Sequence, residues 1–166
     1  KTYEHKHKSL LLFNGCNHNY NKVKEKILEN EQFVKTKTLT NISNGIAIYK
    51  DLKKILFFDV VQPSNLEIHK ELGAGSLAIE ISAYGEKIIT NCGGSEVGGK
   101  NPAYLKYSAA HSTIILDNTN VSEIKESDFN KDFIKKVNFE IKDDDKLLIF
   151  SGTHNGYLTN YNKMCN

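Results

Sequence analysis

From residue 33 to the end of the chain, large apolar side chains recur at every second position in short runs. In residues 77–82 and 137–142, for example, large apolar residues alternate with smaller or polar ones. A period of two is typical of a strand that buries one face. Asn44-Gly45 and Tyr84-Gly85 separate such runs at places where a tight turn would reverse the chain. The pattern predicts antiparallel sheets, because parallel strands need longer crossovers.

Many short strands joined mostly by tight turns are typical of two packed sheets. The predicted fold class is therefore all-β: an antiparallel β-sandwich, supersandwich-like, with one short helix. The helix is predicted over Asn19–Asn30, where Val23, Ile27 and Leu28 form one apolar stripe. We expect a single domain that spans residues 1–166. The predicted strands cover residues 9–13, 38–42, 46–49, 55–61, 77–82, 87–91, 113–117, 137–141 and 147–150, with a helical turn at 128–133, a turn at 143–145, and a closing segment at 152–157.

Length and composition exclude several kinds of protein. A chain of this length buries about 70% of its unfolded surface, so neither a disulfide nor a metal ion is required for folding. Cys16, Cys92 and Cys165 have unrelated spacings and form no metal motif, so we expect free thiols. The net charge of +2 gives no reason to expect nucleic acid or a membrane as partner. No apolar run reaches the length of a membrane span, and no signal peptide is visible.

A glycine-rich loop covers residues 93–103 and contains four glycines and Pro102. Paired glycines can hold a phosphate when the loop leads into a helix whose N-terminus faces the anion. This loop leads instead to Pro102 and then to a predicted strand. We therefore expect no nucleotide site there.

Three histidines are candidates for chemistry. His111 follows Ala109 and Ala110, which are small enough to let another surface approach its ring. Composition alone favours a structural histidine at the start of a strand over a functional one. His154 precedes Asn155-Gly156, which favours a histidine in a surface turn, and His69 has charged neighbours, which favours a solvated one.

Four runs carry a resemblance to a known family: AGSLAIEIS, IITNCGG, YLKYSAAHSTIILDNT and SGTHNGY. In order and spacing they resemble the C-terminal sheet domain of the heparinase II/III family of polysaccharide lyases, in which alanine-alanine-histidine precedes a buried strand. The resemblance covers most of residues 9–161. It implies a two-part enzyme, in which a helical toroid and a β-sandwich enclose the active cleft, and this chain supplies only the second part. It also implies a periplasmic or secreted protein.

The resemblance further implies cleavage of an acidic, uronic-acid-containing polysaccharide by β-elimination. His111 and His69 are then the expected catalytic residues of this chain, and a tyrosine comes from the helical domain. Family members often carry histidine-x-histidine where this chain has Glu71-Leu72-Gly73, and zinc-binding members have an aspartate at the position of Asn91. Because an asparagine carbonyl is a poor zinc ligand and one imidazole cannot hold zinc, we expect no cofactor and no structural zinc.

Two other functions stay open. The chain could be a non-catalytic carbohydrate-binding or structural sandwich, in which Tyr104, Tyr107 and Lys106 bind sugar, although sheet packing also explains the tyrosines. It could also be an interaction module whose sheet edge recruits a partner strand. All 22 basic residues are lysine, which disfavours sulfated substrates because arginine is the usual ligand for such groups, although a biased genome also explains the composition.

Overall fold

The computed structural model of the chain has the predicted all-β architecture, with antiparallel sheets packed into a sandwich. The predicted helix Asn19–Asn30 lies outside the described residues, and of the predicted strand at 9–13 only Leu12 is described. Cys16, Cys165 and His69 also lie outside them, while Cys92 is an exposed free thiol. The structure describes residues 12, 39–43, 45–61, 73–93, 103–124, 131–132, 134, 136–144 and 147–161.

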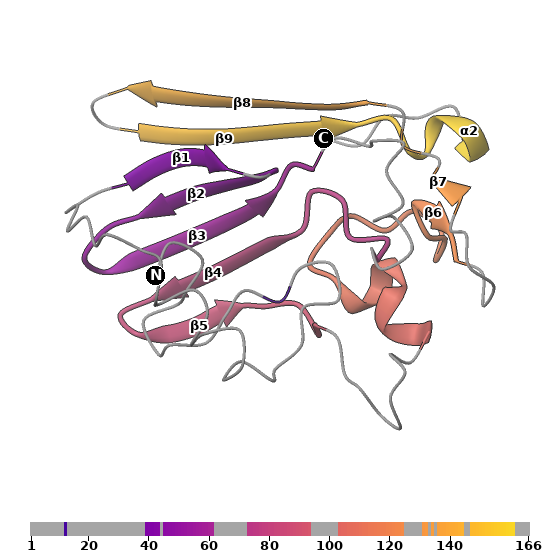
Figure 1. Cartoon of the computed structure of the whole chain (residues 1–166), viewed down its shortest axis with the longest axis horizontal. Coiled ribbons are helices and arrows are strands. Elements are labelled where there is room, and N and C mark those ends of the chain that lie inside the picture. Colours follow the sequence, from indigo (N-terminus) through magenta and orange to yellow (C-terminus); the bar gives the residue numbers. More distant parts are fainter. Residues whose placement is uncertain are drawn as a thin grey trace, which may run out of the picture.

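The larger sheet has five antiparallel strands that follow one another in chain order (Figure 1). Its first turn uses Gly45, whose φ of 76° suits glycine. Its last turn places Tyr84 and Gly85 at φ 53° and 98°, as a tight hairpin requires. The strands are β1 (Leu39–Ser43), β2 (Ile46–Lys50), β3 (Lys54–Asp59), β4 (Ile79–Ala83) and β5 (Glu86–Ile89).

A long hairpin of β8 (Val137–Asp144) and β9 (Leu147–His154) lies over one face of this sheet (Figure 1). The ring centroids of Phe58 in β3 and Phe139 in β8 are 5.3 Å apart, so the two layers share one core. At Gly152 a Cβ atom would lie 2.7 Å from Leu77 and 2.8 Å from Phe58. Only glycine therefore lets β9 approach the sheet so closely at this point.

The opposite face of the sheet is buried as well. Ile48, Ile55 and Phe57 form a second apolar cluster on it. Glu80 and Ser82 lie on that face and are 0% and 2% exposed. The alternation in residues 77–82 predicted that only the isoleucine face is buried, and this is wrong because the sheet is covered on both sides.

Several local predictions are corrected by the structure. Residues 113–117 were predicted to form a strand, but only Leu116 makes an isolated bridge, to Thr119. Asp117 and Asn118 have φ of 49° and 56°, so the chain turns there instead of continuing as a strand.

Two further segments differ in type from their predictions. Residues 131–132 form β7 (Lys131–Asp132), which pairs with β6 (Ser122–Glu123), in place of the predicted helical turn. Strand β8 continues through Asp144, where a turn was predicted at 143–145.

The segment after Pro102 forms two 3₁₀ helices, η2 (Ala103–Lys106) and η3 (Ser108–Ala110), and helix α2 (Leu158–Tyr161) follows β9.

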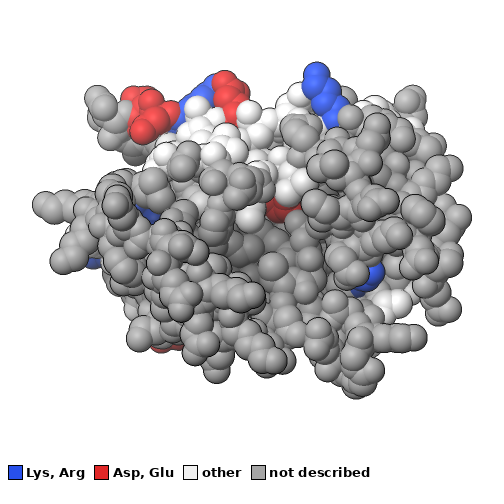
Figure 2. Space-filling model, in the orientation of Figure 1, with Lys and Arg blue, Asp and Glu red and all other residues white. Residues whose placement is uncertain are grey.

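The surface over the β8–β9 hairpin carries charges of both signs along its upper edge (Figure 2). Lys142 and Glu140 of β8 form an exposed ion pair at 3.2 Å. Such a pair stabilises little in water, so its effect is mainly on solubility. Within the part of the chain that the structure describes, no helix has the length and apolar character of a membrane span.

Candidate functional site

His111 ends the 3₁₀ helix η3 and is only 8% exposed. The residues on either side of it are fixed to the end of β5. The Cys92 N–H donates to the carbonyl of Ala110 at 3.0 Å, and the Ser112 N–H donates to Oδ1 of Asn91 at 2.8 Å. The backbone around His111 is therefore held by the larger sheet, although no regular strand begins there.

Two glycines lie directly against the imidazole of His111. A Cβ atom at Gly73 would lie 2.6 Å from Nε2, and one at Gly75 would lie 2.8 Å from Cγ. Between them, Ala74 donates its N–H to the carbonyl of Lys106 at 2.7 Å and accepts from Oγ of Ser108 at 2.8 Å. These bonds hold residues 73–75, the glycine segment, over the ring. Glycine is required at positions 73 and 75 because a side chain at either position would collide with the imidazole.

Neither ring nitrogen of His111 has a hydrogen-bond partner among the described residues. Burial lowers the pKa of His111, because the charged imidazolium is poorly solvated there. The ring is therefore held neutral in this chain. Both nitrogens are buried, so a substrate at the surface cannot contact them unless the glycine segment moves.

Beside His111, Asn91 is the centre of a buried polar network. Its Nδ2 donates to Oε1 of Glu80 at 3.1 Å and to the carbonyl of Ile79 at 3.3 Å. Its Oδ1 accepts from the N–H of Ser112 at 2.8 Å and from Oγ of Ser112 at 3.3 Å. Oε1 of Glu80 also accepts from the Leu12 N–H at 2.6 Å. Both amide hydrogens and the oxygen of Asn91 are bonded, while the single hydroxyl hydrogen of Ser112 also lies against the carbonyl of Ile79, so this side chain links β4, the segment after β5 and the His111 segment.

The network leaves Asn91 with a structural role in this chain. Across the described ranges, no three histidine, cysteine, aspartate or glutamate side chains are grouped so that they could hold a metal ion. Gly73 lies opposite Nε2 of His111, where a Cβ atom would be 2.6 Å from that nitrogen, and it has no side chain that could offer a ligand atom. The residues described around His111 therefore do not fit a zinc ion.

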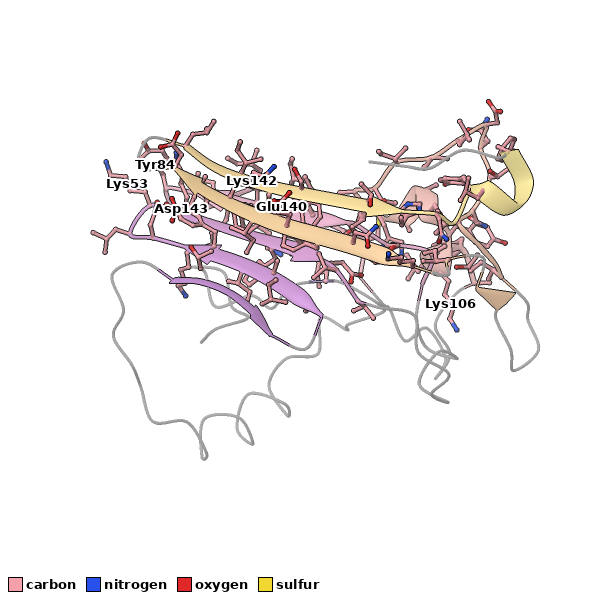
Figure 3. All side chains as sticks on the ribbon, turned by 90° about the horizontal axis from the view of Figure 1, so that it is seen from above. Lys53, Tyr84, Lys106, Glu140, Lys142 and Asp143 are labelled. Carbon is pink, nitrogen blue, oxygen red and sulfur yellow. The ribbon has the colours of Figure 1, made fainter. Side chains whose placement is uncertain are left out.

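The three residues predicted to bind sugar lie on the short segment that leads to His111. Tyr104 is 62% exposed and Tyr107 is 41% exposed, so neither packs in the core. Lys106 lies between them in sequence, and its side chain lies at the end of the molecule away from Lys53 and Tyr84 (Figure 3). These three residues lie close to His111 along the chain, and His69 lies outside the described residues.

His154 is buried, although the sequence predicted a surface turn. It is 1% exposed at the end of β9, and its Nδ1 accepts from the Gly156 N–H at 3.1 Å. Because Nδ1 is the acceptor, the proton of the neutral ring is on Nε2, which is buried and has no partner in the described structure. Phe150, Gly152 and His154 share the inward face of β9, so extending the alternation of that strand would have predicted a buried histidine.

A groove of about 600 Å³ passes beside His154. One wall is formed by residues 150–154 of β9 and the other by residues 112–114. The floor is apolar and consists of Phe58, Leu77 and Ile79. The sequence did not predict this groove, because it depends on how the hairpin packs over the sheet.

The burial of His154 predicts how the free energy of unfolding depends on pH. Burial lowers the pKa of His154 below its ordinary value of 6.5, so the unfolded chain binds more protons below that pH. The free energy of unfolding is therefore not reduced by this histidine well above pH 6.5. It decreases as the pH falls below 6.5, by at most about 1.4 kcal/mol per pH unit for one histidine. The buried His111 adds an effect of the same sign.

Urea unfolding of the chain between pH 7.5 and 5 measures this effect. The His154→Phe variant keeps a ring beside Tyr157 but cannot be protonated, so its stability is expected to fall less steeply over the same range. Equal slopes for the two proteins would contradict the assignment of the effect to His154.

One family model matches the chain. It is described as "Heparinase II/III-like, C-terminal" and covers residues 43–164, which is well over half of the chain. Comparison with curated proteins and with solved structures finds no match. The matched range begins at the last residue of β1 and extends beyond α2, so it includes strands β2 to β9 and the His111 segment.

Proposed function

We propose that this chain, which belongs to the heparinase II/III-like, C-terminal family, is the sheet domain of a polysaccharide lyase. The proposed substrate is an acidic polysaccharide that contains uronic acid, and the proposed reaction is β-elimination. A helical domain of the same protein is proposed to complete the cleft. The chain alone is proposed to bind the polysaccharide without cleaving it.

The observation that carries this proposal is the exposed surface next to His111. Tyr104 and Tyr107 present large rings to solvent on the segment that ends at His111. An aromatic ring offers a flat apolar face with a polar tip, and Lys106 adds a positive charge suited to a uronate carboxylate. Family membership and this surface together favour a carbohydrate ligand over other classes.

β-Elimination requires two proton transfers. A base removes the C5 proton of the uronate, the bond between the sugar and the leaving oxygen breaks, and an acid protonates that oxygen. His111 is neutral, as a base must be, but both of its nitrogens are buried in this chain. We therefore propose that the proton transfers take place only in the completed cleft.

A second candidate is a non-catalytic carbohydrate-binding sandwich. The burial of His111 favours it, because a ring whose two nitrogens are covered by the glycine segment is suited to a structural role. Under this candidate the longer protein binds the polysaccharide but forms no unsaturated product.

Two measurements test the proposal. Titration of the chain with uronate oligosaccharides is expected to show binding that Tyr104→Ala weakens about tenfold, which corresponds to about 1.4 kcal/mol. A longer protein that includes the helical domain is expected to form unsaturated ends that absorb ultraviolet light, and His111→Ala is expected to abolish them. Tyr84→Ala is the matched control for binding, because Tyr84 is also exposed but lies at the other end of the molecule (Figure 3).

The outcomes separate the candidates. Binding by the longer protein with no unsaturated product on a broad panel of uronate polymers would select the second candidate. An equal loss of affinity in the Tyr84→Ala and Tyr104→Ala variants would remove the proposed binding surface. No binding and no turnover by either protein would overturn both candidates.

A further inference from the structure

The groove beside β9 follows the edge of a strand. Five consecutive residues of β9, from Phe150 to His154, line it, so both inward-facing and outward-facing residues take part. A ligand in the groove would therefore contact the backbone edge of β9. The apolar floor of Phe58, Leu77 and Ile79 would face one side of that ligand.

Among the residues that the structure describes, the edge of β9 that faces away from β8 has no backbone partner. In an antiparallel ladder only alternate residues bond to the neighbouring strand, and the others present their N–H and C=O groups to the other side. β9 pairs with β8 alone, and along its residues the structure gives no other backbone hydrogen bond. An open edge of this kind is a template for another strand.

The two strands of the hairpin differ sharply in charge. β8 contains Glu140, Lys142, Asp143 and Asp144, whereas none of the eight residues of β9 carries a carboxylate or an amine. Charged side chains normally protect a strand edge from unwanted pairing. The edge of β8 is protected in this way and the edge of β9 is not.

The facing wall of the groove also lacks a strand partner within the described part of the chain. Residues 113–116 are rich in aliphatic and β-branched side chains typical of a strand, yet only Leu116 makes a bridge there. Ile114 is 47% exposed and Ile115 is 40% exposed. One inserted strand would give this segment a partner and would cover exposed apolar surface.

His154 supplies a fourth, independent observation. It lines the groove and is 1% exposed, and its protonated Nε2 is a buried donor without an acceptor in the described structure. A buried donor that lacks an acceptor is costly, and the carbonyl of an inserted backbone would provide one once the end of β9 shifts to expose Nε2 to the groove.

We propose that the groove between β9 and residues 112–114 binds an extended, uncharged segment of a partner polypeptide, which pairs with β9 as an added strand. Charge complementarity selects this occupant, because none of the described residues that line the groove carries a formal charge, so they offer no cation to an acidic sugar chain. The inserted strand spans about five residues along β9, or roughly 17 Å. This inference does not depend on the proposed carbohydrate binding.

The test uses a fluorescent eight-residue peptide of alternating valine and threonine, with both ends blocked, and the whole chain. Binding is measured by fluorescence anisotropy. Ile114→Lys is expected to weaken binding at least about tenfold, because it places a charge in the groove wall. The matched control is Ile115→Lys, since Ile115 is similarly exposed but does not line the groove, and a change below about twofold is expected.

Hydrogen exchange with the peptide bound locates the site. Slower exchange is expected in residues 147–154 and 113–116. A peptide of alternating valine and glutamate is expected not to bind. Lack of saturable binding by the uncharged peptide, equal effects of the two lysine variants, or protection confined to other segments would each overturn the proposal.

Discussion

Replacing Asn91 with aspartate is expected to destabilise the folded chain by about 3–5 kcal/mol at pH 7.5, a cost typical of an uncompensated buried charge. The Asn91 amide donates to Oε1 of Glu80 at 3.1 Å, and Glu80 is fully buried. A carboxylate at position 91 has no hydrogen to donate and brings a second negative charge against the first. The carbonyl of Ile79 also loses a donor.

The pH dependence of the Asn91→Asp variant identifies the cause. Two carboxylates in contact raise the pKa of the pair, because one of them is more stable when protonated. A raised folded-state pKa stabilises the fold at low pH and loses that effect as the pH rises. The difference from the parent chain in the free energy of unfolding is therefore expected to shrink between pH 7.5 and pH 5, as measured by urea unfolding.

Asn138→Asp is the matched control for this substitution. Asn138 is exposed on β8 and donates to Oγ1 of Thr153 at 3.3 Å, so the same chemical change occurs at the surface. It is expected to change stability by less than about 0.5 kcal/mol. Similar effects at both positions would show that the buried network has no special importance.

The second large effect is expected for Gly75→Ala, which should destabilise the fold by about 1–3 kcal/mol through overpacking. A methyl group at this position would lie 2.8 Å from Cγ and 2.9 Å from Nδ1 of His111. Gly75 does not adopt a positive φ, so the cost comes from the ring and not from the backbone.

A double-mutant cycle with His111→Ala tests that reason. Removing the ring opens the space that the new methyl group needs, so Gly75→Ala is expected to cost at least about 1 kcal/mol less in the His111→Ala background. Thermal or urea unfolding of the four proteins measures the coupling. Additive effects would place the strain somewhere other than the imidazole.

The sequence predicted the sheets well where local signals specify them. Gly45 and Tyr84-Gly85 do lie in hairpin turns, and the alternation in residues 137–142 does match the buried and exposed faces of β8. These features depend on neighbours in the chain, so a single sequence contains them.

The sequence failed where the outcome depends on distant segments. Residues 113–116 have the composition of a strand, but nothing in the chain order shows that they lack a pairing partner. Alternation predicts that Glu80 faces solvent, yet Asn91 and Leu12 bring donors to it across the fold. The glycines over His111 and the groove beside His154 are likewise products of packing.

The apolar residues of strand β3 affect how the correct strand register is selected. Phe57 packs into one apolar cluster and Phe58 into the other, so both faces of the strand are apolar. A slip by one residue would exchange the two rings without exposing apolar surface, and hydrophobicity alone therefore does not choose the correct alignment. The hairpin turns must therefore fix the register. The turn at Gly45 is the most restrictive of them, because a Cβ atom there would lie 2.7 Å from Val61.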